Sequence, residues 1–221
     1  MSEWEIIWQQ RDTFISGFGT TFTLFTVASI ASLLIGIGLL YLMDNGHEKC
    51  KSGLRLWVNI MRTLPYLILA YLLYYGLPQL GVRMDALTVG FVSLSIYHGA
   101  YFCEIFRGQR RGMDHGLIEA AQACGFSRHK IFTRIIIPSV VFKSIPLIAN
   151  QLIICLKDTA FLSIITVLDI TAAANSVQSM YFIPLKAFVI AIGLYWLISI
   201  VIEQVSKYCM QNIEKRGLSN A

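Results

Sequence analysis

The chain has 221 residues, of which 56% are apolar and only 14% are charged, and its mean hydropathy is +0.62. A soluble domain of this size carries about a quarter charged residues, so this composition excludes a small soluble enzyme and a disordered chain. The formal charge of +5 is typical of nucleic-acid binding in a soluble protein. Here the basic residues fall in the loops of a membrane protein, so we expect no nucleic-acid partner.

Long charge-free runs predict membrane-spanning helices. Thirty-one residues without Asp, Glu, Lys or Arg separate Asp12 from Asp44, and 20 separate Arg62 from Arg83, whereas roughly 20 apolar residues suffice to cross the bilayer. In chain order we expect five spans, over about 18–43, 54–80, 86–106, 142–167 and 184–205. The second could also begin at 62, and 171–180 reads as a small, polar connection. The expected fold is a single all-α, polytopic transmembrane domain over 1–221.

The distribution of basic residues predicts the orientation of these spans. One set of loops carries thirteen Lys and Arg residues, in 49–55, 107–143 and 207–216, whereas the other set carries Arg11, Arg83 and Lys186. Cytoplasmic loops are the ones enriched in Lys and Arg. We therefore expect the N-terminus outside the cell and the C-terminus in the cytoplasm. Because Glu3 and Glu5 precede Arg11, the basic start of a cleaved signal peptide is missing, and the first span is expected to remain in the mature protein.

Several kinds of chemistry are not expected from this sequence. The five cysteines form no C-x-x-C pair and show no ligand spacing with the four histidines, so we expect free thiols and no metal. No Gly-Lys dipeptide occurs, which excludes a phosphate-binding loop. The chain is therefore not expected to hydrolyse ATP, and it is expected to have no cofactor of its own.

The longest loop, about 108–140, has a periodic pattern of its own. Leu117, Ile118, Ala121 and Cys124 recur three or four residues apart, like one face of a helix, until Gly125 interrupts them. A second short periodic piece follows over 131–135, and we expect the next proline to end it. The pattern predicts two short helices with a glycine bend, lying parallel to the membrane and offering an apolar ridge to a cytoplasmic partner. The alternative is a basic amphipathic segment resting on lipid headgroups.

This loop resembles the EAA loop of ABC importer permeases. Glu119-Ala120-Ala121, Gly125, Ile135 and Pro138 stand in the order E-A-A-x-x-x-G followed after nine residues by I-x-x-P. Three further segments are similar to the histidine, glutamine and arginine permeases, the polar amino acid branch of these importers. They are Arg62-Thr63 with Pro65, Tyr101-x-x-Glu104-Ile105-Phe106-Arg107-Gly108, and Leu156-Lys157-Asp158-Thr159. The resemblance covers about residues 14–205.

The resemblance implies a function and a set of partners. The chain would be the permease subunit of an ATP-driven, binding-protein-dependent importer of polar amino acids, with the type I permease fold, in the bacterial inner membrane. Its partners would be cytoplasmic ATP-binding subunits, an identical or homologous second permease, an extracytoplasmic amino acid-binding protein and the lipid bilayer. Glu119, Ala120, Ala121, Gly125, Ile135 and Pro138 would couple it to the ATPase. The alternatives are a permease for another solute, a non-transport membrane scaffold and an intramembrane enzyme, although no catalytic groups converge in the spans.

Charged residues within the spans are the remaining candidates, because each costs about 2.5–3.5 kcal/mol to insert. Lys157 and Asp158 are adjacent and point about 100° apart on a helix, so they cannot pair well with each other. Together with Thr159 they are candidates for the substrate path, where a lysine and an aspartate could receive the carboxylate and ammonium of an amino acid. The alternative is a structural ion pair with Glu104, Arg107, Arg62 or a second subunit.

Other residues in the spans are expected to have structural roles. Glu104 and Arg107, three residues apart, are predicted to form an ion pair, and Arg62 is expected to extend to the headgroups. His98 is expected to be a hydrogen-bonded interior residue. A small-residue face on the first span is expected to pack in a dimer, and it comprises Ser29, Ser32, Gly36 and Gly38.

Overall fold

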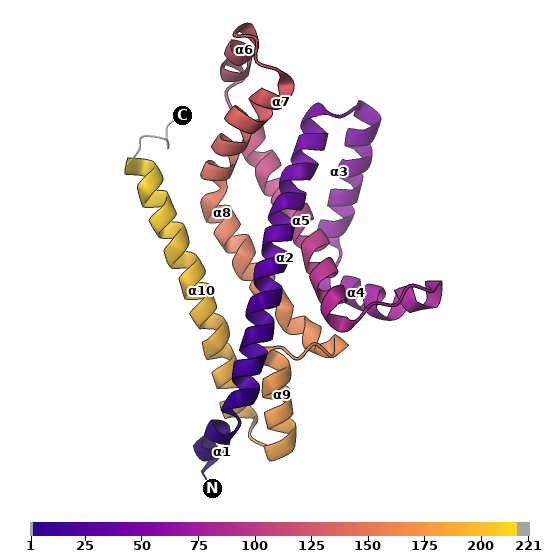
Figure 1. Ribbon diagram of the computed structural model, residues 1–221, viewed down its shortest axis with the longest axis vertical. Helices are drawn as coiled ribbons and strands as arrows, with labels where there is room; N and C mark the ends of the chain where they lie inside the picture. Colours follow the sequence, from indigo (N-terminus) through magenta and orange to yellow (C-terminus); the bar gives the residue numbers. More distant parts are fainter. Residues whose placement is uncertain (1, 216–221) are drawn as a thin grey trace.

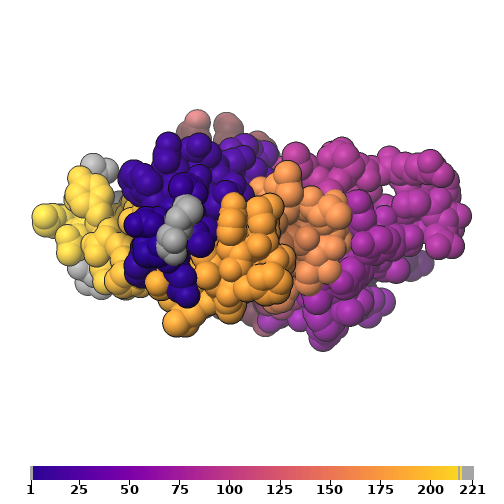
Figure 2. Space-filling model, turned by 90° about the horizontal axis from the view of Figure 1, so that it is seen from below, coloured from indigo at the N-terminus to yellow at the C-terminus, as the bar shows by residue number. Residues whose placement is uncertain are grey.

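The computed structural model describes residues 2–215, and every regular element within that range is a helix. Within these residues, four helical runs are long and apolar enough to cross a membrane, and a sharply bent helix pair makes a fifth span if it is counted as one. The molecule is long, with the N-terminus at one end and α6 at the other (Figure 1). Seen from the N-terminal end, its cross-section is elongated, with α10 at one edge and the segment after Pro65 at the other (Figure 2).

The centre of the fold is a close crossing of α2 (Arg11–Asn45) and α5 (Ala86–Arg111), preceded by the short α1 (Glu3–Gln9). Both long helices extend beyond the expected spans 18–43 and 86–106. A Cβ atom at Gly36 would lie 2.7 Å from Cβ of Phe102, so only glycine allows this approach. The expected dimer role of the small face is therefore wrong, because Ser29, Ser32 and Gly36 are buried against helices of the same chain. Gly38 points elsewhere and has no neighbour within 4 Å.

The second predicted span, 54–80, is not one straight helix. α3 (Glu48–Thr63) and the helical stretch Tyr66–Leu80 meet at an angle of 104°, and the second stretch changes from α4 (Tyr66–Tyr71) to the π-helix η1 (Leu72–Gly76) and the 3₁₀-helix η2 (Leu77–Leu80). Pro65 causes the break because it has no N–H and disfavours a helical residue before it. Figure 1 shows the second stretch turning away from the bundle.

The long loop contains α6 (His115–Ala123) and α7 (Arg128–Ile131), as expected, but its second helix does not end at Pro138. α7 continues through the π-helix η3 (Phe132–Ile136) into α8 (Ile137–Asp158). The wider π turn lets the chain pass the proline at the second position of α8, where a missing N–H costs little. The fourth span therefore begins before the predicted residue 142, and after residue 158 it tightens into the 3₁₀-helix η4 (Thr159–Ile165).

The last part of the chain differs from the expected polar connection. Residues 171–180 belong to α9 (Ile170–Tyr181), whose N-cap Asp169 accepts a hydrogen bond from the N–H of Ala172 at 2.7 Å. α9 packs beneath α2, where a Cβ on Gly17 would lie 2.7 Å from the carbonyl oxygen of Asp169. α10 (Pro184–Lys215) then runs along most of the molecule and ends ten residues beyond the predicted end at 205.

Candidate functional site

The bend in the long loop is a Schellman motif. Gly125, just after α6, has φ +77°, a conformation that costs other L-residues about 1–2 kcal/mol. Its N–H donates to the carbonyl of Gln122 at 2.9 Å, and the N–H of Phe126 donates to the carbonyl of Ala121 at 3.1 Å. These two bonds satisfy the last carbonyls of α6 and turn the chain toward α7. The predicted glycine bend is therefore present.

The other motif residues of this loop divide into exposed and buried ones. Glu119 and Ala120 are exposed on α6, and Glu119 makes no ion pair with the residues that the structure describes. Ala121 was expected to face a partner, but it is 9% exposed and packs into a cluster with Phe106 and Phe132. Ile135 packs against the same cluster, and Pro138 lies in the first turn of α8. One face of α6 is thus exposed, and the opposite face packs into the buried cluster.

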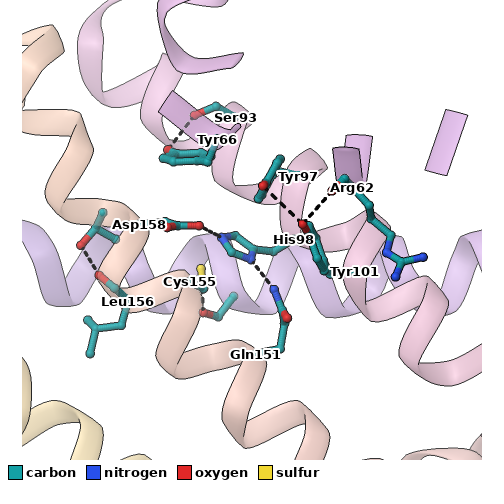
Figure 3. Close-up of polar contacts among 12 residues, drawn as sticks. Arg62, Tyr66, Ser93, Tyr97, His98, Tyr101, Gln151, Cys155, Leu156 and Asp158 are labelled. Atoms are coloured by element: carbon teal, nitrogen blue, oxygen red, sulfur yellow. Dashed lines mark hydrogen bonds and ion pairs between the residues drawn. The ribbon is translucent and has the colours of Figure 1, made fainter. Parts of the chain in front are cut away.

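A second group of polar residues surrounds His98, which is completely buried on α5 (Figure 3). Nε2 of Gln151 lies 2.8 Å from Nδ1 of His98. Nε2 of His98 lies 3.4 Å from Oδ2 of Asp158 and makes no hydrogen bond within residues 2–215. His98 is therefore an interior, hydrogen-bonded residue as expected, and its second ring nitrogen lies beside a carboxylate.

Tyrosines form the wall of this group. The ring centroids of Tyr66, Tyr97 and Tyr101 lie 6.3, 5.3 and 6.4 Å from that of His98. The hydroxyl of Tyr97 donates to the carbonyl of Leu64 at 3.0 Å, and that of Tyr101 donates to the carbonyl of Arg62 at 3.0 Å. These bonds satisfy carbonyls that lose their helical donors at the break before Pro65, so the bent span is fixed to α5 at the site itself.

The two adjacent charges of the fourth span diverge. Asp158 faces His98, and its side chain is 16% exposed. Lys157 lies on another face, where it lines a cavity of about 370 Å³ between α8 and α10 with Tyr195 and Trp196, and it makes no ion pair with any described side chain. The expected joint reception of one zwitterion by this pair is therefore wrong. Thr159 is buried, and its hydroxyl donates to the carbonyl of Leu156.

Glu104 forms the predicted ion pair with Arg107 near the C-terminal end of α5. Its Oε2 accepts from Nη2 of Arg107 at 2.6 Å and from Nε of the same guanidinium at 2.8 Å. Arg62 does not simply extend to the headgroups, because its Nη1 lies 3.8 Å from the same oxygen and its guanidinium lies over the ring of Tyr101, 5.6 Å from the centroid. Arg62, Glu104 and Arg107 therefore hold one another, whereas Oδ2 of Asp158 lies near Nε2 of His98, at 3.4 Å.

Sequence reasoning did not identify the tyrosines or Gln151 as part of this site. The spacing of Tyr97, Tyr101 and Glu104, four and then three residues apart, places them on one face of α5, and this was a usable signal. Gln151 gave no comparable signal, because its role depends on which helix α8 lies against. That contact is long-range in the sequence.

Comparison with known proteins gives the family of this fold. Residues 44–215 match the family of binding-protein-dependent transport system inner membrane components. The chain belongs to this family. Among its relatives, the probable amino-acid permease protein YxeN of Bacillus subtilis is 27% identical over 98% of this chain and 96% of its own length. The histidine/lysine/arginine/ornithine transport system permease protein HisQ of Escherichia coli is 32% identical, covering 81% of this chain and 84% of its own length.

Solved structures agree with that assignment. The crystal structure of an amino acid ABC transporter with histidines matches with a TM-score of 0.86 at 25% identity, covering 96% of this chain and 99% of that one. An inward-facing form of the MetNI methionine ABC transporter matches with a TM-score of 0.72 at 17% identity, over 95% and 99% of the two chains, which supports the fold alone. The expected all-α fold of an ABC importer permease is confirmed.

Proposed function

We propose that this chain is the permease subunit of an ATP-driven, binding-protein-dependent importer of polar amino acids. The observation that carries the proposal is the match along nearly the whole length to an amino acid ABC transporter chain, together with relatives described as amino-acid permeases. The chain would work in the bacterial inner membrane with a second permease copy or homologue, and ATP would be bound by a partner ATPase.

The coupling surface in this proposal is the exposed face of α6. Glu119 and Ala120 are the motif residues exposed there, and the Schellman bend fixes the helix relative to α8. Small residues allow close approach by a partner, while the buried cluster beneath α6 transmits force to α5 and α8. A movement of the ATPase subunits would thus reach the spans through a short, packed path.

The substrate path in this proposal runs beside the group around His98. Asp158 supplies a partly exposed carboxylate, and the tyrosines supply faces on which a cation can rest. An amino acid ammonium group fits this combination of charges better than its carboxylate does. Lys157, on the α10 side, has no role in this path.

The test of the transport function is reconstitution of the chain with its co-purifying ATPase subunits and binding protein in liposomes. We expect ATP hydrolysis that depends on the binding protein and rises with one group of polar amino acids in a panel. A rate of ATP hydrolysis that changes neither with the binding protein nor with any amino acid of the panel would contradict the proposal.

The substrate path is tested by Asp158→Asn with Lys157→Gln as the adjacent control. We expect Asp158→Asn to insert normally and to lower transport or to change the preference among cationic, neutral and anionic amino acids. Lys157→Gln should leave that preference unchanged. A large loss of thermal stability in Asp158→Asn, with unchanged preference in the surviving fraction, would instead assign Asp158 a structural role beside His98.

A further inference from the structure

A basic cavity lies at the end of the molecule that carries α6. Four arginines and one histidine line a space of about 290 Å³, and they are Arg55, Arg107, Arg110, Arg111 and His115. They come from α3, from the end of α5 and from the start of α6, which Figure 1 shows at the same end of the fold. The fold, and not a single basic run, brings these side chains together around one space.

The negative charge at this cavity is smaller than the positive charge. Asp44 at the end of α2 is the carboxylate in the lining, and its oxygens lie 3.4 and 3.5 Å from Nη2 and Nε of Arg110. Arg107 is held from behind by Glu104. Arg55 and Arg111 make no ion pair with the side chains described in residues 2–215. Among the described residues, at least two guanidinium charges are therefore left without a carboxylate partner.

The arginines that are paired still have donors available for a ligand. Each guanidinium carries five N–H groups, and the ion pairs of Arg107 and Arg110 use Nε and Nη2 in both cases. The side chains of these two arginines are only 18% and 19% exposed, so their positions are fixed. A planar fork with free N–H groups matches the oxygens of a phosphate group.

We propose that this cavity binds the phosphate of an anionic phospholipid headgroup. Leu40 and Met43 form an apolar part of its lining, so the cavity joins basic groups for a phosphate to an apolar wall for the start of the acyl chains. The volume is at the lower limit of small-molecule pockets, which suits a headgroup better than a larger solute. Basic pockets between spans at the cytoplasmic surface bind such headgroups.

This site is separate from the proposed transport function. It lies at the ends of α2 and α5, whereas the group around His98 lies further along α5, and the phospholipid site needs neither ATPase nor binding protein. A failure of the phospholipid proposal would leave the transport proposal intact, and a failure of the transport proposal would leave the phospholipid site intact.

The experiment compares melting temperatures of the purified full chain in neutral detergent with phosphatidylglycerol, phosphatidylcholine or inorganic phosphate added. The test variant is Arg55→Gln/Arg111→Gln, which removes the two unpaired guanidinium groups. The matched control is Arg128→Gln/Lys130→Gln, which removes two exposed charges from α7 at the same end of the molecule. Arg111→Gln alone serves as a milder variant if the double variant folds poorly.

We expect phosphatidylglycerol, and not phosphatidylcholine, to raise the melting temperature of the wild type and of the control. In the test variant the Kd for phosphatidylglycerol should rise about thirtyfold, since each basic residue near a membrane surface contributes roughly 1 kcal/mol. A shift produced equally by inorganic phosphate and lost in the test variant would support the phosphate site with free phosphate as its source. No shift with either compound, or an equal loss of the shift in test and control variants, would overturn the proposal.

Discussion

Replacing Gly125 is the perturbation that most directly probes the bend before α7. The residue has φ +77°, and a Cβ atom there would meet nothing within 4 Å. The cost of a side chain is therefore conformational and not steric. It should be small for Asn, which tolerates this region, larger for Ala, and largest for β-branched Ile.

The magnitude follows from the Schellman geometry. An alanine with left-handed φ loses about 1–2 kcal/mol, and 1.4 kcal/mol corresponds to about a tenfold change in an equilibrium constant. If the strain opens the two hydrogen bonds that end α6, the fraction of molecules with a docking-competent α6 falls by about five- to thirtyfold. The apparent affinity for the ATPase then falls by the same factor. Gly125→Ile should fall further, to the loss of amino-acid-stimulated ATP hydrolysis.

The assay is amino-acid-stimulated ATP hydrolysis by the reconstituted complex, with the melting temperature and membrane insertion of the chain measured in parallel. The matched control is Gly112→Ala at the end of α5. Gly112 has φ −84° and its nearest atom to a new Cβ lies 3.6 Å away, so alanine is tolerated there. This reasoning would be refuted if Gly125→Ile kept the amino-acid-stimulated ATP hydrolysis of the wild type. It would also be refuted if Gly112→Ala and Gly125→Ala lowered that activity equally.

Three further predictions concern stability in detergent. Gly36→Ala should lower the melting temperature, because its Cβ would overlap Phe102 and overpacking costs about 1–3 kcal/mol, whereas Gly38→Ala should leave it unchanged or raise it; equal effects would contradict the close crossing. Glu104→Gln should destabilise the chain by about 1–3 kcal/mol, because it removes the carboxylate that holds Arg107, and should not change amino-acid preference; a changed preference would place Glu104 on the substrate path. Burial raises the pKa of Asp169, which lies between the spans and α9, to about 6, whereas an unfolded chain has an aspartate pKa of about 3.9. Ionisation of Asp169 in the folded state therefore lowers the stability of the wild type as pH rises through about 4–6. The melting temperature of Asp169→Asn minus that of the wild type should increase from pH 5 to pH 7.5. A difference that stays constant with pH would exclude this effect of the buried carboxyl group.

Local patterns predicted the features that depend on neighbouring residues. The glycine bend at Gly125 follows from a break in a helical repeat, and the ion pair of Glu104 with Arg107 follows from their spacing of three. The expected end of the second loop helix at Pro138 was wrong, because a π turn just before the proline lets the helix continue past it. Single-residue propensities do not encode such a turn.

Long-range contacts could not be predicted in this way. The pairing of Asp158 with His98 joins α8 to α5 across 60 positions of the sequence, and nothing local in either segment selects the other. The same limit applies to the small residues of α2: their pattern predicted close packing correctly but not its partner, which is α5 of the same chain.

Cross-linking from the exposed face of α6 tests the central claim most directly. A photo-reactive amino acid is placed at Ala120, and a control is placed at Leu80, which is 79% exposed at the end of η2, with the ATPase subunits and binding protein co-expressed in both cases. We expect the probe at position 120 to capture the ATPase subunit and the probe at position 80 not to capture it. Capture from position 80 but not from position 120 would contradict α6 as the coupling element.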